Sequence, residues 1–169
     1  MASVMDRDQV VALIPRLRRY ARALVSDAGA ADDLVQDTLE RALGKFHLWK
    51  PGTDLRAWLF TIMHNVHVNQ IRRRRESAAF DEETMDLPVG PSHEGALAAR
   101  DLQRALDRLP SEQREVLLLV VLEEMSYQEV ASALELPIGT VMSRLSRARD
   151  KLRVAMEGTT LSTRLQVVK

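Results

Sequence analysis

Apolar residues recur at helical spacing along nearly the whole chain, which predicts an all-α fold. In the N-terminal part the pattern predicts three helices. The second spans 27–46, with Ser26 or Asp27 as its N-cap, and the third spans 54–75, with Asp54 as its N-cap. The faces predicted to be buried carry Val10, Val11, Leu13, Ile14, Leu17, Tyr20, Ala21 and Leu24, then Leu34, Val35, Thr38, Leu39, Ala42, Leu43 and Phe46, then Leu55, Trp58, Leu59, Ile62, Met63 and Val66.

The C-terminal part is predicted to be helical as well. One helix ends at Pro110, and Ser111 is predicted to cap the next. The sequence Ser126-Tyr127-Gln128-Glu129 is a capping box before a short apolar helix, and a tight connection over 135–139 leads to a last helix from Thr140 to about Met156. Because this last helix is strongly basic, the pair predicts a helix-turn-helix. The faces predicted to be buried carry Ala96, Leu97, Leu102, Ala105, Leu106 and Leu109, then Val116, Leu117, Val120 and Val121.

Between these parts, residues 76–94 carry helix breakers and no hydrophobic periodicity. The chain is therefore predicted to form two small helical domains, at 6–75 and 95–156, joined by a flexible acidic linker at 76–94.

Charge is segregated along the chain although the formal net charge is zero. Lys and Arg exceed Asp and Glu by thirteen to eight over 1–75 and by five to one over 138–153, whereas 76–94 carries six acids and no Lys or Arg. Local fields guide a polyanion more than the total charge does. Two separate basic segments therefore remain compatible with nucleic-acid binding.

Several classes of protein are disfavoured. The chain has no cysteine, which excludes disulfide scaffolds and thiolate metal sites, and it lacks a signal-peptide pattern or an apolar run long enough for a membrane span. His64 and His67 have a spacing that can bind zinc, but no third ligand is near in sequence. No nucleophile elbow, phosphate loop or HExxH motif is present. We expect a cytoplasmic protein that is not an enzyme and uses no metal or cofactor.

The last helix has the composition of a DNA-recognition helix. Short polar and basic side chains near its N-terminus can reach base edges, and the arginines that follow can contact phosphates. The candidates are Thr140, Met142, Ser143, Arg144, Ser146 and Arg147, while Val141, Leu145, Ala148 and Leu152 are predicted to hold the helix to its domain. The alternative is a solvated basic helix in a helical bundle.

Two features of the first domain are ambiguous by themselves. The helix over 54–75 bears an aromatic residue and ends in four arginines, which suits contact with opened DNA strands, yet Trp58 on its apolar stripe is more typical of a core. Trp49, in the preceding loop, fits either role. The acidic face of the helix over 27–46 is either a solvated surface or an interface.

Four stretches, in order, resemble the extracytoplasmic-function (ECF) sigma factors of bacterial RNA polymerase. They are YARALVSDAGAADDLVQDTLERAL, LRAWLFTIMHNVHVNQIRRRR, LDRLPSEQREVLLLVVLEEMSYQEVASAL and LPIGTVMSRLSRARDKLR. The resemblance implies that 6–75 is sigma region two, which binds core polymerase and the −10 element, and that 95–156 is sigma region four, which binds the −35 element. It also implies regulation by an anti-sigma factor.

The resemblance assigns roles to residues. It implies that core polymerase is bound by Asp33, Leu34, Gln36, Asp37 and Thr38. For the −10 element it implies the loop over 47–54 with Trp49, then His64, Asn65 and Asn69, and then Arg72, Arg73, Arg74 and Arg75 along the DNA backbone. For the −35 element it implies binding by the helix that begins at Thr140. Met142 departs from the family, many members of which carry arginine there, and methionine cannot make a bidentate contact with guanine.

Two rival interpretations explain less. A plain helix-turn-helix repressor or activator leaves 27–75 without a purpose, and a structural adaptor does not account for two basic helices. The acids of the linker either occupy the RNA channel of polymerase or form a solvated tether.

Overall fold

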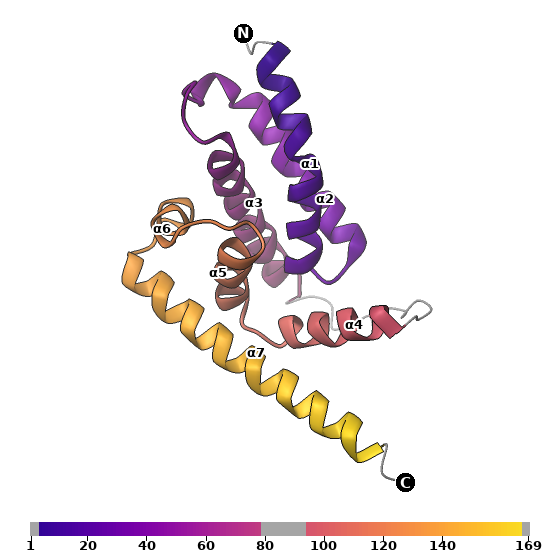
Figure 1. The fold of residues 1–169 in the computed structure, drawn as a ribbon. Coiled ribbons are helices and arrows are strands. Elements are labelled where there is room, and N and C mark those ends of the chain that lie inside the picture. Colours follow the sequence, from indigo (N-terminus) through magenta and orange to yellow (C-terminus); the bar gives the residue numbers. More distant parts are fainter. Residues whose placement is uncertain (1–3, 79–93, 167–169) are drawn as a thin grey trace. The chain divides into compact units, whose positions relative to one another are not determined.

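A computed structural model describes the backbone of residues 4–78 and 94–166 and the side chains of residues 7–78 and 97–158. In chain order the elements are α1 (Val4–Leu24), α2 (Ala28–Gly44), the 3-10 turn η1 (Phe46–Leu48), α3 (Leu55–Ala78), α4 (Glu94–Asp107), α5 (Ser111–Val121), α6 (Tyr127–Leu134) and α7 (Ile138–Gln166) (Figure 1). The described ranges contain helices and no strand, which confirms the all-α prediction. They divide into two compact units, the first with α1 to α3 and the second with α4, α5, α7 and α6 up to Ala131.

In the first unit, α2 packs against both α1 and α3. The core is aliphatic, as the low aromatic content requires, and Leu17, Leu34, Leu59 and Met63 are at most 1% exposed. One aromatic pair joins α1 to α3, since the rings of Tyr20 and Phe60 meet edge to face at 5.0 Å. The predicted buried face is wrong at Val11 and Leu43, which are exposed because no described helix covers the outer edge of that stripe.

In the second unit, α7 packs against α5 and α4. Val116 and Leu119 of α5 and a stripe on α7 formed by Val141, Leu145 and Ala148 are all at most 2% exposed. Three of the four residues predicted for that α7 stripe are buried, whereas the fourth, Leu152, is only half-buried. Three predictions are wrong, since Leu97, Leu102 and Val121 are exposed. Hydrophobic periodicity predicts which side of a helix is apolar. Which residues on that side are covered by another helix depends on the tertiary packing.

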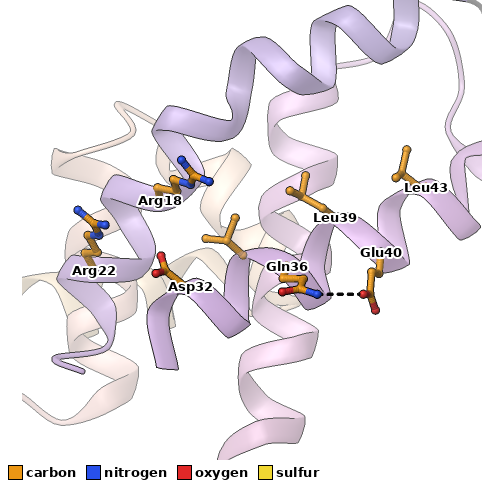
Figure 2. A pocket seen from close by; sticks show the side chains of 8 residues that line it. Arg18, Arg22, Asp32, Gln36, Leu39, Glu40 and Leu43 are labelled. Carbon is orange, nitrogen blue, oxygen red and sulfur yellow. Dashed lines mark hydrogen bonds between the residues drawn. The ribbon is translucent and has the colours of Figure 1, made fainter. Parts of the chain in front are cut away.

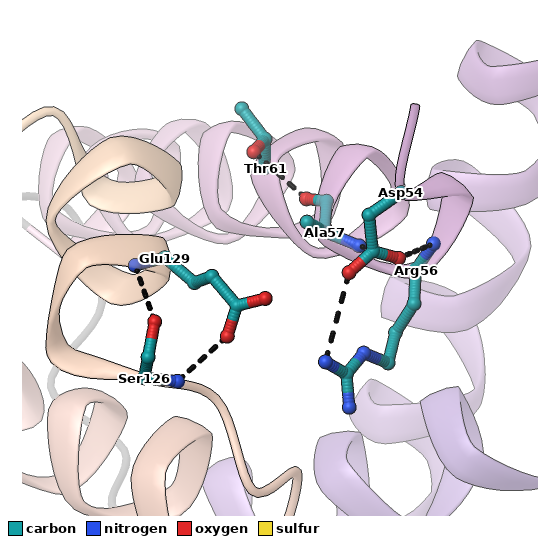
Figure 3. Close-up of polar contacts among 6 residues, drawn as sticks. All are labelled: Asp54, Arg56, Ala57, Thr61, Ser126 and Glu129. Carbon is teal, nitrogen blue, oxygen red and sulfur yellow. Dashed lines mark hydrogen bonds and ion pairs between the residues drawn. The ribbon is translucent and has the colours of Figure 1, made fainter. Parts of the chain in front are cut away.

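The helix starts follow local hydrogen bonding (Figure 3). Asp27 Oδ2 accepts from Ala30 N at 2.9 Å, and Asp54 Oδ1 accepts from Arg56 N at 2.9 Å and from Ala57 N at 3.3 Å, so both are N-caps. The capping box is confirmed, because Ser126 N donates to Glu129 Oε2 at 2.7 Å and Glu129 N donates to Ser126 Oγ at 3.1 Å.

Three predicted boundaries are corrected. Ser111 is not an N-cap, because the Pro110 carbonyl already accepts from Gln113 N and Arg114 N at 3.0 Å each. For the same reason α7 begins at Ile138, since the Pro137 carbonyl accepts from Thr140 N at 3.0 Å, and the helix continues to Gln166.

The predicted linker overlaps α3, which runs to Ala78, and α4, which begins at Glu94. Its remaining part, from residue 79 to 93, lies outside the described residues, and the domain limits 6–75, 76–94 and 95–156 remain predictions.

Arg114 of α5 forms hydrogen bonds and an ion pair with the C-terminal end of α4 and the turn that follows it. Its Nη2 donates to the backbone oxygens of Asp107 at 2.7 Å and Leu109 at 3.2 Å, and its Nη1 lies 3.7 Å from Asp107 Oδ1. Burial lowers the pKa of the Arg114 guanidinium, and the nearby Asp107 carboxylate opposes that shift. Arg114 thus satisfies carbonyls that the end of a helix leaves open.

Replacing Arg114 by alanine is expected to lower the free energy of unfolding by about 2 kcal/mol, because hydrogen bonds from a charged donor are lost. Arg114→Lys should recover only part of this, since lysine lacks the planar fork. Urea unfolding followed by circular dichroism measures both. Arg108→Ala, at an exposed arginine of the same connection, is the control and should change little. An Arg114→Ala protein as stable as this control would contradict the assigned role.

Candidate functional site

The acidic face of α2 is a solvent-facing surface. Asp33, Gln36 and Asp37 are exposed, together with Asp32 and Glu40. Leu34 and Thr38, predicted for the same interface, are fully buried, and Thr38 Oγ1 donates to the Leu34 carbonyl at 2.7 Å. Three of the five predicted residues are therefore available to a partner, while Leu34 and Thr38 fix α2 inside the unit.

A groove runs between α1 and α2 beside this face (Figure 2). On its α2 side, Gln36 Nε2 donates to Glu40 Oε1 at 3.4 Å. The lining residues are Arg18 and Arg22 from α1 and Asp32, Val35, Gln36, Leu39, Glu40 and Leu43 from α2. The sequence analysis missed the contribution of α1. The four-residue spacing of Arg18 and Arg22 on the polar side of that helix is the signal that indicates it.

Asp37 connects the acidic face to α3. Its Oδ2 accepts from Gln70 Nε2 at 2.9 Å, across 33 positions of sequence. The acidic face of α2 is therefore linked to α3 by this hydrogen bond as well as by the packing of the two helices.

The loop between α2 and α3 has an aromatic base. The ring of Phe46 lies 5.4 Å from that of Trp49 and 5.9 Å from that of Trp58. Trp49 is 8% exposed, and its Nε1 has no hydrogen-bond partner among the described residues. Trp58 is only half-buried. Trp49 thus anchors the loop in this structure, and the more accessible indole belongs to Trp58.

One stripe along α3 is polar and accessible. Helical spacing aligns Trp58, Thr61, Asn65, Asn69 and Arg72, of which Asn65 and Arg72 are exposed and the other three half-buried. Arg73, Arg74 and Arg75 extend an exposed basic end. His64 is half-buried and His67 buried, and residues of the described ranges form no cluster of three or more metal-binding side chains.

The helix-turn-helix presents a polar face on α7. Met142, Ser143, Ser146 and Arg147 are exposed. The other two predicted residues, Thr140 and Arg144, are half-buried. Arg144 Nη2 lies 3.4 Å from Glu112 Oε2 of α5, and Ser143 Oγ donates to the Thr140 carbonyl at 3.1 Å. The predicted set is therefore brought together, with Arg144 held at its edge by Glu112, which the sequence analysis did not single out.

Within the described residues, no helix is both long and apolar enough to cross a bilayer.

Two family models match the chain, one in each part. Residues 10–64 match the model described as the Sigma2 domain of PhyR, and residues 99–152 match Sigma-70, region 4. The first range contains the α2 face and the start of the α3 stripe. The second contains the helix-turn-helix.

Similar proteins cover most of the chain. The ECF RNA polymerase sigma factor EcfG of Rhodopseudomonas palustris is 40% identical over 86% of this chain and 82% of its own length. The solved structure of the sigma factor RpoE of Bartonella quintana with the anti-sigma factor NepR is 36% identical, with a TM-score of 0.80 over 89% of this chain and 96% of that one. CnrH in complex with the cytosolic domain of CnrY is 26% identical, with a TM-score of 0.68 over 93% of this chain and 91% of that one.

Proposed function

Since the chain belongs to the ECF family of RNA polymerase sigma factors, we propose how its helical units divide the work of directing core polymerase to promoters. The first unit binds polymerase and the −10 element, and the second binds the −35 element as duplex. The chain is an initiation factor, and we assign it no catalytic role of its own. Its place of action is the cytoplasm, where polymerase and promoters are.

Polymerase is bound by the exposed residues of the α2 face, Asp33, Gln36 and Asp37. An acidic surface that meets a basic partner speeds encounter and fixes the register of docking. Leu34 and Thr38 act indirectly, because they hold the helix that carries these side chains.

The −10 element is read along the α3 stripe. Asn65 and Asn69 have amide groups that can hydrogen-bond base edges, with His64 beside them, and the arginines at 72–75 neutralise phosphates of the opened strand. Trp49 supports this site indirectly, because its ring lies 5.4 Å from that of Phe46 and anchors the loop before α3.

The −35 element is read by α7. Its second and third turns offer Ser143, Ser146 and Arg147 to base edges and phosphates. Arg144 is shared between DNA and Glu112, which lies 3.4 Å away and competes for the guanidinium. Glu112 thus limits how much this arginine contributes to binding.

We also propose that an anti-sigma factor controls this chain. One of the similar structures, RpoE with NepR, is a sigma factor in complex with an anti-sigma factor. Such a partner would have to cover the α2 face to block polymerase binding and the α7 face to block binding of the −35 element.

The observation that carries the assignment is the pair of polar surfaces, on α3 and on α7, that belong to separate units of one chain. In reconstituted transcription, the purified chain with core polymerase should yield transcripts that start at defined positions. The chain alone should bind duplex DNA weakly. Strong binding to duplex DNA without polymerase, and no defined transcripts with it, would favour a repressor instead.

A further inference from the structure

An exposed methionine stands in the middle of the polar face of α7. Met142 is 51% exposed, and it is flanked by Ser143 and by Ser146 and Arg147 one turn later. Ile138, one turn earlier on the same side, is 44% exposed. Single exposed apolar side chains are common on protein surfaces. Met142 differs from these because of its position. It lies near the N-terminus of the second helix of a helix-turn-helix, which is the part of that motif that contacts base edges.

The chemistry of the major groove limits what such a side chain can recognise. Methionine has no hydrogen-bond donor, and its thioether is a weak acceptor, so it cannot complement the amino or carbonyl groups of the bases. Among the groups displayed on major-groove edges, only the C5-methyl of thymine is apolar. An unbranched side chain with several rotatable bonds adapts readily to such a contact.

We propose that Met142 is a specificity-determining residue that contacts a thymine methyl in the −35 element, with Ile138 enlarging the apolar contact from the turn before. This inference rests on the function proposed for α7. It predicts that the promoters recognised by this chain carry a thymine, on either strand, within the −35 element. This thymine should lie next to the base pairs that Ser143, Ser146 and Arg147 contact. Burying one methyl group should change affinity about three- to fivefold.

The test replaces the methyl group alone. Promoters are first selected by the holoenzyme, reconstituted from core polymerase and the full chain, from duplexes randomised across the −35 region. The selected promoter is then made with deoxyuridine in place of each −35 thymine in turn. Wild-type holoenzyme should bind one of these promoters about three- to fivefold more weakly than its thymine counterpart.

The Met142 variants decide whether this side chain is responsible. With Met142→Ala the ratio of thymine to deoxyuridine affinities at that position should fall to about 1, whereas Met142→Leu, which keeps an apolar side chain, should retain the preference. Arg147→Ala is the matched control, since it should weaken binding to both promoters equally and leave the ratio unchanged. Met142 is exposed, so each variant should show the unfolding curve of the wild type.

Two results would overturn the inference while leaving the function intact. The first is a wild-type holoenzyme that selects defined promoters and yet binds each thymine promoter and its deoxyuridine counterpart equally. The second is a Met142→Ala variant that keeps the wild-type ratio. Failure of the wild-type holoenzyme to select any promoter is a different outcome, because it would reject the proposed function itself.

Discussion

Replacing Asp33 by lysine should weaken binding of the chain to core polymerase at least about tenfold, because it would set a cation against the basic partner surface that we propose for the α2 face. Asp33 is exposed on α2, so the change should not disturb the core. Promoter-dependent transcription at limiting sigma factor should fall in proportion. The measurement is a titration of core polymerase with labelled chain, repeated at several salt concentrations, since screening should shrink the difference between wild type and variant.

The matched control is Asp8→Lys. This residue is exposed on α1, in the same unit, and its replacement changes the net charge by the same amount. It should bind polymerase like the wild type. Equal losses in both variants would point to long-range charge alone, and no loss with Asp33→Lys would remove the α2 face from the interface.

Replacing Leu34 by alanine, one position further along, should have a large effect of a different kind. Leu34 is 0% exposed, and truncating a buried leucine leaves a cavity that costs about 2–5 kcal/mol. Much of the stability of a small helical unit would then be lost. Thermal and urea unfolding should show the destabilisation directly. The loss of transcription should become larger as the assay temperature rises, because more of the variant is then unfolded.

Leu43→Ala serves as the comparison on the same helix. Leu43 is exposed, so its truncation should change stability by only about 0.5 kcal/mol. If Leu34→Ala unfolded like this control, and yet failed to bind polymerase, Leu34 would be a contact residue and the division between α2 face and core would be wrong.

The neighbouring residues Asp33 and Leu34 illustrate how far the candidate site can be predicted from the sequence. Helical spacing places Leu34 and Thr38 on the apolar side of α2, but the family motif runs across both sides, so resemblance alone assigns one role to the whole stretch. Burial separates Asp33 from Leu34, since it reports which side chains a partner can reach.

Other features depend on contacts between distant segments. Trp49 lies in a loop without periodicity, and its burial follows from packing on Phe46. The groove needs Arg18 of α1 beside Leu39 of α2, and the pairing of Glu112 with Arg144 joins two helices. The capping box at Ser126 and the N-caps Asp27 and Asp54 are local features, and the sequence predicts them. It fails at Ser111, because the neighbouring Pro110 is the N-cap of α5.

The length of α7 has a mechanical consequence. It is one uninterrupted helix of 29 residues, which corresponds to about 43 Å. The end that carries Met142 and the end near Gln166 therefore belong to a single continuous helix. Val141, Leu145 and Ala148 are buried in the half of α7 that packs against α5, so that half is held by the core. A small rotation there would displace the distal turns near Gln166 by the largest distance, because displacement grows with distance along a rigid helix.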